Sequence, residues 1–314
     1  RADAHLTMAS PVLSPGELSV RSDASGGDVL PQVAGALGAY GGRLVFLFHG
    51  FNDSFADASA AYASFFANFP GPGNALHDKW QPAIHSCYWP GDKSWGAVSA
   101  ASYALEMGPA KQSAAVFANF LAALPIPNGA TLDIYFVAHS LGNRVVLELL
   151  SALEATKTAG GLSSQIQFKG FCTMAAAVPV SMVESNADLY QAATLSSTRR
   201  TLYSEADTVL HFAFPIGEAA ALEGFFPTAI GRYGQPQSNW TAQTEMFISP
   251  THGYNHGDYW GQPNTIPQIS VFLGIPTASA PPSASIAQHT LPTPASLAQN
   301  QIPSRALPSS PYLG

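Results

Sequence analysis

Short apolar runs that alternate with helical stretches constrain the fold of this chain more than any other feature. The first run, Leu44–Phe48, is continuously apolar, which is typical of a strand buried on both faces of a parallel sheet. The stretch 55–69 then carries alanine and aromatic residues at helical spacing and ends at Pro70-Gly71. It fits a crossover helix that packs back on the strand, so the chain begins as an α/β protein does.

The same alternation continues along the chain. Further strand candidates are 83–89, 132–137, 166–174 and 200–203, and further helical stretches are 95–124, 141–153 and 266–273. Within 95–124, Gly108-Pro109 predicts a break and hence two helices. The apolar face of the second would carry Val116, Phe117, Phe120, Leu121 and Leu124. Strands alternating with helices predict a mainly parallel central sheet with helices on both faces.

Composition divides the chain into three parts. Residues 1–28 are rich in Ser, Pro, Gly and Asp, with one strand-like piece at Leu18–Arg21, so we expect an N-terminal extension or edge strand. Residues 29–275 hold the other predicted elements and form the main domain. Residues 276–314 are dominated by Pro, Ser, Ala, Gln and Thr. Such a segment cannot build a core, and we expect a C-terminal tail.

Charge and hydropathy exclude several classes of partner. Only 11% of the residues are charged and the formal net charge is −7, so a basic surface for nucleic-acid phosphates is not expected. No apolar run approaches the roughly 20 residues of a membrane-spanning helix. We expect a soluble protein with no transmembrane segment, and the sequence leaves its compartment open, with secretion or the periplasm as one alternative. Cys87 and Cys172 lie in apolar strand candidates, which favours buried thiols over a disulfide.

The strand candidate 132–137 runs straight into a helix, and this junction carries the clearest chemical signal. The segment Ala138–Gly142, with the sequence AHSLG, has the spacing of a nucleophile elbow, in which a serine sits on a sharp strand-to-helix turn. Alanine stands at the usual first glycine and adds only one methyl group. We therefore predict Ser140 as a nucleophile, whereas His139 should point away from it toward packing partners.

A serine nucleophile needs a histidine base and a carboxylate that fixes the tautomer of that base. Asp207, just after the strand candidate 200–203, is the predicted acid. Glu205 is the next candidate, and a helix N-cap is the competing role for Asp207. Two histidines lie in the loop 251–258. We predict His256 as the base because it ends the loop that enters the last helix, with His252 as the alternative.

The oxyanion of an acyl-transfer intermediate needs backbone N–H donors. Leu141, which follows the nucleophile, supplies one, and the loop after the first strand supplies the other. Gly50 lets that loop turn closely, so the N–H of Phe51 is the expected second donor; the alternative is that His49-Gly50 is merely a turn. Several large side chains between 215 and 240 either line an acyl pocket or partial lid or pack in the core: Phe225, Phe226, Ile230, Tyr233 and Trp240.

Four segments together resemble a bacterial family of largely uncharacterised α/β-hydrolases: Phe48–Asn52, Tyr88–Gly91, Ala138–Arg144 and Ser204–Asp207. The elbow that begins with alanine is also similar to that of small bacterial lipases. The resemblance covers roughly residues 40–275 and implies an α/β-hydrolase catalytic domain over 29–275. It further implies a triad of Ser140, Asp207 and His256 with oxyanion donors Phe51 and Leu141, and at least one strand between the two cysteines.

These residues predict a serine hydrolase that cleaves a carboxylic ester through an acyl-enzyme intermediate. The expected substrate is a small-molecule or lipid-like ester, and neither a metal nor an organic cofactor is implied. A triad alone does not select the leaving group, so lipase, thioesterase and amidase activities are alternatives. A binding protein that keeps a hydrolase fold without catalysis is the alternative from another class.

Overall fold

The computed structural model describes residues 17–21, 42–51, 53–69, 83–91, 100–222, 227–233 and 240–275, with only the backbone for 100–106. All of these residues belong to the unit Arg1–Ala278. The predicted tail 276–314 and most of the predicted extension 1–28 lie outside the described residues. Residues 17–21 belong to the predicted extension, and all the other described residues belong to the predicted main domain 29–275.

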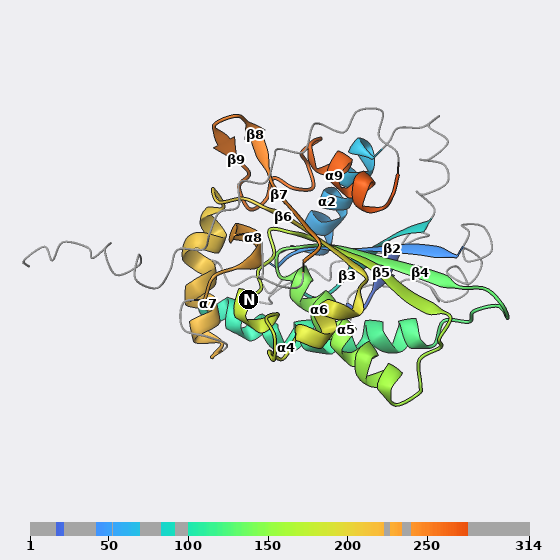
Figure 1. Ribbon diagram of the computed structural model, residues 1–314. Helices are drawn as coiled ribbons and strands as arrows, with labels where there is room; N and C mark the ends of the chain where they lie inside the picture. The colour runs from blue at the N-terminus through green and yellow to red at the C-terminus, as the bar shows by residue number, and fades with distance from the viewer. Residues whose placement is uncertain are drawn as a thin grey trace, which may run out of the picture. The chain divides into compact units, whose positions relative to one another are not determined.

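The described residues form a seven-stranded sheet (Figure 1). Its order is β1-β3-β2-β4-β5-β6-β7, and all six neighbouring pairs are parallel. The strands are β1 (Glu17–Ser19), β2 (Arg43–Phe48), β3 (Ile84–Tyr88), β4 (Leu132–His139), β5 (Ile166–Met174), β6 (Thr198–Tyr203) and β7 (Ala242–Glu245). The predicted fold class, a mainly parallel α/β sheet, is confirmed.

Helices cover both faces of the sheet. In Figure 1, α2 (Phe55–Asn68) and α9 (Thr265–Phe272) lie on one face. On the opposite face lie α4 (Ala100–Ala122), α5 (Gly142–Thr158) and α6 (Tyr190–Leu195). Burial from both sides explains why β2 is continuously apolar, since Leu44, Val45 and Leu47 are all fully buried.

In Figure 1, α7 (Phe214–Ala220), α8 (Ile230–Tyr233) and the antiparallel pair of β8 (Phe247–Ser249) and β9 (His252–Gly253) lie near one end of the sheet. The π-helical turn η3 (Val209–Ala213) directly precedes α7, and the short 3-10 turn η2 (Val180–Met182) follows β5. β7 to β9 were not predicted because they are short, and β7 has the polar sequence AQTE. A four-residue polar strand carries no periodic apolar signal.

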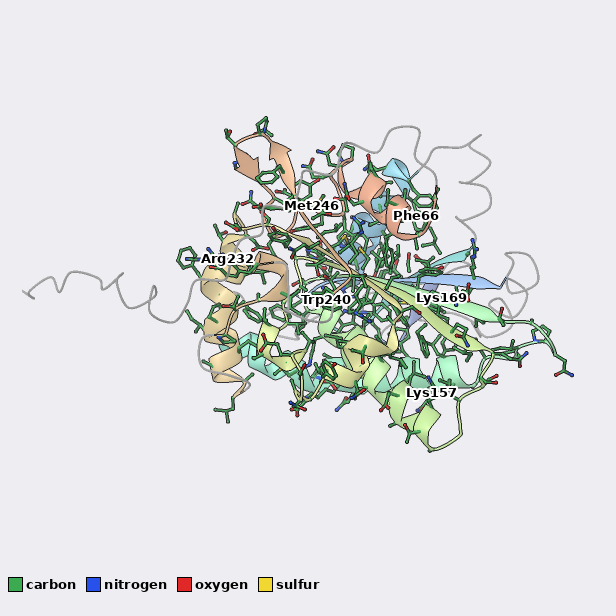
Figure 2. All side chains as sticks on the ribbon, in the orientation of Figure 1. Phe66, Lys157, Lys169, Arg232, Trp240 and Met246 are labelled. Carbon is green, nitrogen blue, oxygen red and sulfur yellow. The ribbon has the colours of Figure 1, made fainter. Side chains whose placement is uncertain are left out.

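The core forms where side chains of the central strands meet the helices. Phe48 of β2 packs edge-on against Phe117 of α4 with ring centres 5.0 Å apart. Figure 2 shows the side chains packed densely on both sides of the sheet, with Trp240 among them. Trp240 is 7% exposed, and its ring lies 6.1 Å from that of Phe171 on β5. Burial of each such side chain contributes about 1.5–3 kcal/mol to stability.

The prediction of a helix break at Gly108-Pro109 is wrong. α4 is continuous from Ala100 to Ala122 with Pro109 inside it. Proline has no N–H for the preceding turn, but α4 packs along α5 and α7, and Met107 and Ala110 on either side of the proline are both buried. Tertiary packing thus outweighs the lost hydrogen bond. The predicted apolar face is also partly wrong, because Val116 is 54% exposed.

Both cysteines are free and buried. Cys87 lies on β3 and Cys172 on β5, and β2 and β4 separate these strands in the sheet. Burial raises the pKa of the Cys172 thiol to about 12. The predictions of buried thiols and of an intervening strand are confirmed.

Candidate active site

Ser140 occupies the sharp turn between β4 and α5. Its φ is 51°, in the left-handed region that residues other than glycine seldom adopt. The turn is fixed by its surroundings: the Ser140 N–H donates to the Met174 carbonyl at 3.0 Å, and the Asn143 side chain donates to the Ser140 carbonyl at 2.9 Å. Backbone strain of this kind concentrates at functional sites.

Gly142 allows α5 to begin directly against the end of β2. A β-carbon on this residue would lie 2.3 Å from the His49 carbonyl oxygen and 2.9 Å from that of Phe48, so only glycine fits. Ala138, at the other small position of the segment, is fully buried and pairs with Phe48 across the β2–β4 ladder. The elbow and the loop after β2 are therefore in direct contact.

The structure brings Ser140, His256 and Asp207 together. His256 Nε2 lies 2.8 Å from Ser140 Oγ, and His256 Nδ1 lies 2.8 Å from Asp207 Oδ2. A carboxylate only accepts, so Nδ1 carries the proton and Nε2 accepts from the serine hydroxyl. The Asp207 side chain is fully buried and that of His256 is 18% exposed. The imidazole is thus oriented to take the serine proton.

Asp207 uses its two carboxylate oxygens for different partners. Oδ1 accepts the N–H of Leu210 at 2.9 Å, which is the bond that a helix N-cap makes, whereas Oδ2 faces His256. The two roles weighed from the sequence are therefore compatible in one residue. The π-helical turn η3 follows directly, and such turns often occur at functional sites. Glu205, the other candidate acid, is exposed.

His256 lies on a loop with little regular structure, residues 250–260, which we call the histidine loop. Tyr254 ties its start to the end of β7, because its N–H donates to the Met246 carbonyl at 3.0 Å. The Asn255 N–H donates to Asp258 Oδ2 at 2.6 Å. His252, the alternative base, is exposed on β9. The structure thus places His256, and not His252, beside Ser140.

The loop after β2 is held by Asp53, which binds Gly50, and by Trp89, which binds His49. The Gly50 N–H donates to Asp53 Oδ2 at 3.0 Å. His49 Nε2 accepts the Trp89 N–H at 3.1 Å, so His49 Nδ1 is the protonated nitrogen and donates to the Gly50 carbonyl at 2.9 Å. A β-carbon on Gly50 would lie 3.0 Å from Ser140 Cβ. The loop that carries Phe51 therefore adjoins the nucleophile, as does Leu141 next in sequence.

From the sequence, Trp89 and Asp53 had no predicted role in this region, and His139 had only a packing role. Trp89 binds His49 a second time, through its indole N–H to the His49 carbonyl at 2.9 Å. Asp53 lies beside Gly50, and burial raises its pKa to about 6. His139 donates its Nε2–H to the carbonyl of His256 at 2.7 Å. Trp89 lies within the segment Tyr88–Gly91 and Asp53 directly follows Phe48–Asn52, but only the fold shows what they contact.

The large side chains expected between 215 and 240 have separate environments. Ile230 is 1% exposed and, like Trp240, packs in the core. Tyr233 is 40% exposed, and Phe225 and Phe226 lie outside the described residues.

Among the helices that the structure describes, none is long and apolar enough to cross a membrane.

The parallel sheet, with a serine at the turn from its central strand into a helix, defines an α/β hydrolase. Residues 38–220 match the family described as "Alpha/beta hydrolase of unknown function (DUF900)". The chain belongs to this family. The match includes Phe51, Ser140 and Asp207 and ends before His256.

No curated protein matches the chain. Among solved structures, the chain is similar to Aspergillus fumigatus lipase B, with 12% sequence identity and a TM-score of 0.29. The similarity covers 63% of this chain and 46% of the lipase. The chain thus spans less than half of that protein.

Proposed function

We propose that this chain is a serine hydrolase that cleaves carboxylic esters, with Ser140 as nucleophile, His256 as base and Asp207 as acid. The observation that carries the proposal is the pair of 2.8 Å contacts that joins the three side chains in series. A serine hydroxyl is a weak nucleophile unless a base takes its proton. A buried carboxylate on the far side of the imidazole makes the base effective, because it fixes the tautomer and stabilises the imidazolium.

In the proposed reaction, Ser140 Oγ attacks the ester carbonyl carbon while His256 Nε2 takes its proton. The Phe51 and Leu141 N–H groups donate to the negative oxygen of the tetrahedral intermediate. The intermediate collapses when the C–O bond to the leaving alcohol breaks and His256 returns the proton to that alcohol. A water molecule then gives a proton to His256 and attacks the acyl carbon. The bond from that carbon to Ser140 Oγ breaks, the acid is released, and His256 returns the proton to Ser140 Oγ. Apart from this water, these steps use only the side chains and amides of the protein, without a metal or organic cofactor.

The substrate we propose is a small-molecule or lipid-like ester. The triad geometry alone does not discriminate among acyl bonds, so lipase, thioesterase and amidase activities are second candidates. p-Nitrophenyl esters of increasing acyl length, a thioester and an anilide would rank these bonds by kcat/KM.

Fluorophosphonate labelling combined with p-nitrophenyl ester hydrolysis tests the proposal. The native protein should be labelled at Ser140 and turn over, whereas Ser140→Ala should lose all labelling and about 10⁶-fold in kcat. Thermal unfolding of both proteins would show that the variant keeps its fold. A native protein that is neither labelled nor active would instead favour the non-catalytic binding protein.

A further inference from the structure

His139 is the last residue of β4 and comes immediately before Ser140. Its Nε2 lies 2.7 Å from the main-chain carbonyl oxygen of His256. A carbonyl only accepts, so Nε2 carries the proton and donates. His139 and Ser140 are consecutive in sequence and both contact His256. Ser140 Oγ contacts the His256 ring, and His139 Nε2 contacts the His256 backbone.

Apart from this hydrogen bond, the environment of His139 is buried and aromatic and does not require a polar side chain. The residue is 6% exposed, and its ring centre lies 5.8 Å from that of Tyr259 and 6.3 Å from that of Trp260. Its Nδ1 is buried and has no hydrogen-bond partner among the described residues. An unpaired buried acceptor costs about 1–3 kcal/mol. An apolar ring would fill this space without that cost, so the bond to His256 is the feature that distinguishes histidine here.

We infer that His139 is a positioning residue for the proposed base, and that its Nε2–H holds the backbone from which the His256 ring reaches Ser140. This inference rests on the proposed function, because it assigns His139 a role in the same reaction. The sequence predicted only packing for His139. The ring does point toward packing partners, but it also ties the histidine loop to the elbow.

The position of the His256 backbone matters because the ring must meet two fixed partners at once. Asp207 Oδ2 and Ser140 Oγ lie 2.8 Å from opposite nitrogens of the ring, so a shift of the main chain lengthens at least one contact. Displacement of a reacting group by about 1 Å can cost 10²-fold in rate.

His139 also stays neutral, since burial first and the neighbouring His256 second lower its pKa to about 3. It therefore adds no positive charge when His256 takes the proton.

The test compares His139→Gln with His139→Phe in the full chain. The glutamine amide N–H can replace the Nε2–H donor, whereas phenylalanine keeps a ring and removes the donor. Hydrolysis of p-nitrophenyl butyrate should show kcat reduced about 10–100-fold in the phenylalanine variant, with KM within about twofold of the native value. Glutamine should recover most of that loss. A residue that only packs would give the reverse order, because the ring would be tolerated better than the amide.

Two further measurements separate positioning from folding. The final fraction labelled by a fluorophosphonate should match the native protein in both variants, while the labelling rate falls with kcat. If thermal unfolding shows that the phenylalanine variant does not fold, His139→Asn takes its place, since its shorter amide does not reach the His256 carbonyl. His252→Gln and His252→Phe are the matched controls and should leave both rates unchanged, because His252 is exposed.

The low-field proton NMR signal of His256 Nδ1–H provides a readout that does not need turnover. It should persist in the native protein and in His139→Gln and broaden or vanish in His139→Phe. Equal kcat in the native and phenylalanine proteins, or an unchanged Nδ1–H signal in the phenylalanine variant, would overturn the role of His139. Absence of labelling in the native protein would instead overturn the proposed function.

Discussion

The elbow and the histidine loop hold their functional side chains in opposite ways. Ser140 is positioned by its neighbours in the chain, because β4, the strained turn and α5 follow one another without a break. His256 is positioned by Asp207 and His139, which lie 49 and 117 residues away in sequence. The turn at Ser140 is therefore formed by consecutive elements and is then tied to β5 through the Met174 carbonyl, whereas the position of His256 depends on contacts with residues far away in the sequence.

This difference predicts different consequences for substitutions in the two regions. The elbow packs tightly between β2 and β5, so a substitution that adds side-chain volume there should first reduce stability. The histidine loop has little regular structure of its own, and changes to its long-range contacts should first reduce activity. The following experiments test this contrast in order of decreasing expected effect.

His256→Ala and His252→Ala compare two histidines four residues apart. Loss of the base in a triad costs about as much as loss of the nucleophile, about 10⁶-fold in kcat, and we expect this for His256→Ala. His252→Ala should retain activity within about twofold, because His252 is exposed on β9. Ester hydrolysis measures both. Activity lost on His252→Ala and kept on His256→Ala would transfer the base role to His252.

Asp207→Asn separates the catalytic role of this residue from its capping role. The asparagine oxygen can still accept the Leu210 N–H, so the free energy of unfolding should change little. The amide cannot hold the required tautomer of His256, and kcat should fall by about 10⁴-fold. Urea unfolding and ester hydrolysis measure the two effects. If the residue served only as a cap, Asp207→Asn would keep full activity and Asp207→Ala would cost about 1 kcal/mol of stability.

Gly142→Ala probes the close packing of the elbow. Its β-carbon would lie 2.3 Å from the His49 carbonyl oxygen, and overpacking of this kind typically costs about 1–3 kcal/mol in the free energy of unfolding. Gly261→Ala is the matched control in the histidine-loop region, since a β-carbon there has no heavy atom within 4 Å. Urea unfolding compares them. Equal stability of the two variants would show that the elbow is not held by close packing.

Asp53→Asn should give the smallest effect, a change in how stability depends on pH. Burial raises the Asp53 pKa from 3.8 to about 6, with Asp57 acting in the same direction and the Gly50 N–H and His256 opposing it. His49 Nδ1 also faces the carboxylate, at 3.8 Å. The folded protein thus binds the proton more tightly than the unfolded chain, and Asp53 makes the free energy of unfolding fall as pH rises from about 4 to 6.

Asparagine cannot ionise and removes this fall. The difference in stability between Asp53→Asn and the native protein should therefore shift in favour of the variant between about pH 4 and 6 and level off above. Urea unfolding at several pH values measures that difference, in which the other titrating groups cancel. A difference that is constant across this range would show that Asp53 is ionised in the folded protein at the same pH as in the unfolded chain.

Much of the fold followed from the sequence because its signals are local. Buried parallel strands such as 44–48 are short apolar runs, and the elbow needs a serine flanked by small residues between a strand and a helix. Local signals gave a wrong prediction of a helix break at Pro109, where packing along α5 and α7 keeps α4 intact. They also failed at β7, whose polar residues join the sheet only through pairing with β6.

The sequence by itself determined the α/β class, the position of Ser140 in a strand-to-helix turn and a short set of candidates for its partners. Only the tertiary structure decided that His256 rather than His252 meets Ser140. It also decided that Asp207 both accepts the Leu210 N–H and faces the imidazole, and that His139 and Trp89 bind neighbouring loops. The physical reason is range. Strand and turn preferences arise among residues adjacent in the chain, whereas hydrogen bonds across 40 to 117 residues exist only after the sheet has brought its strand ends together.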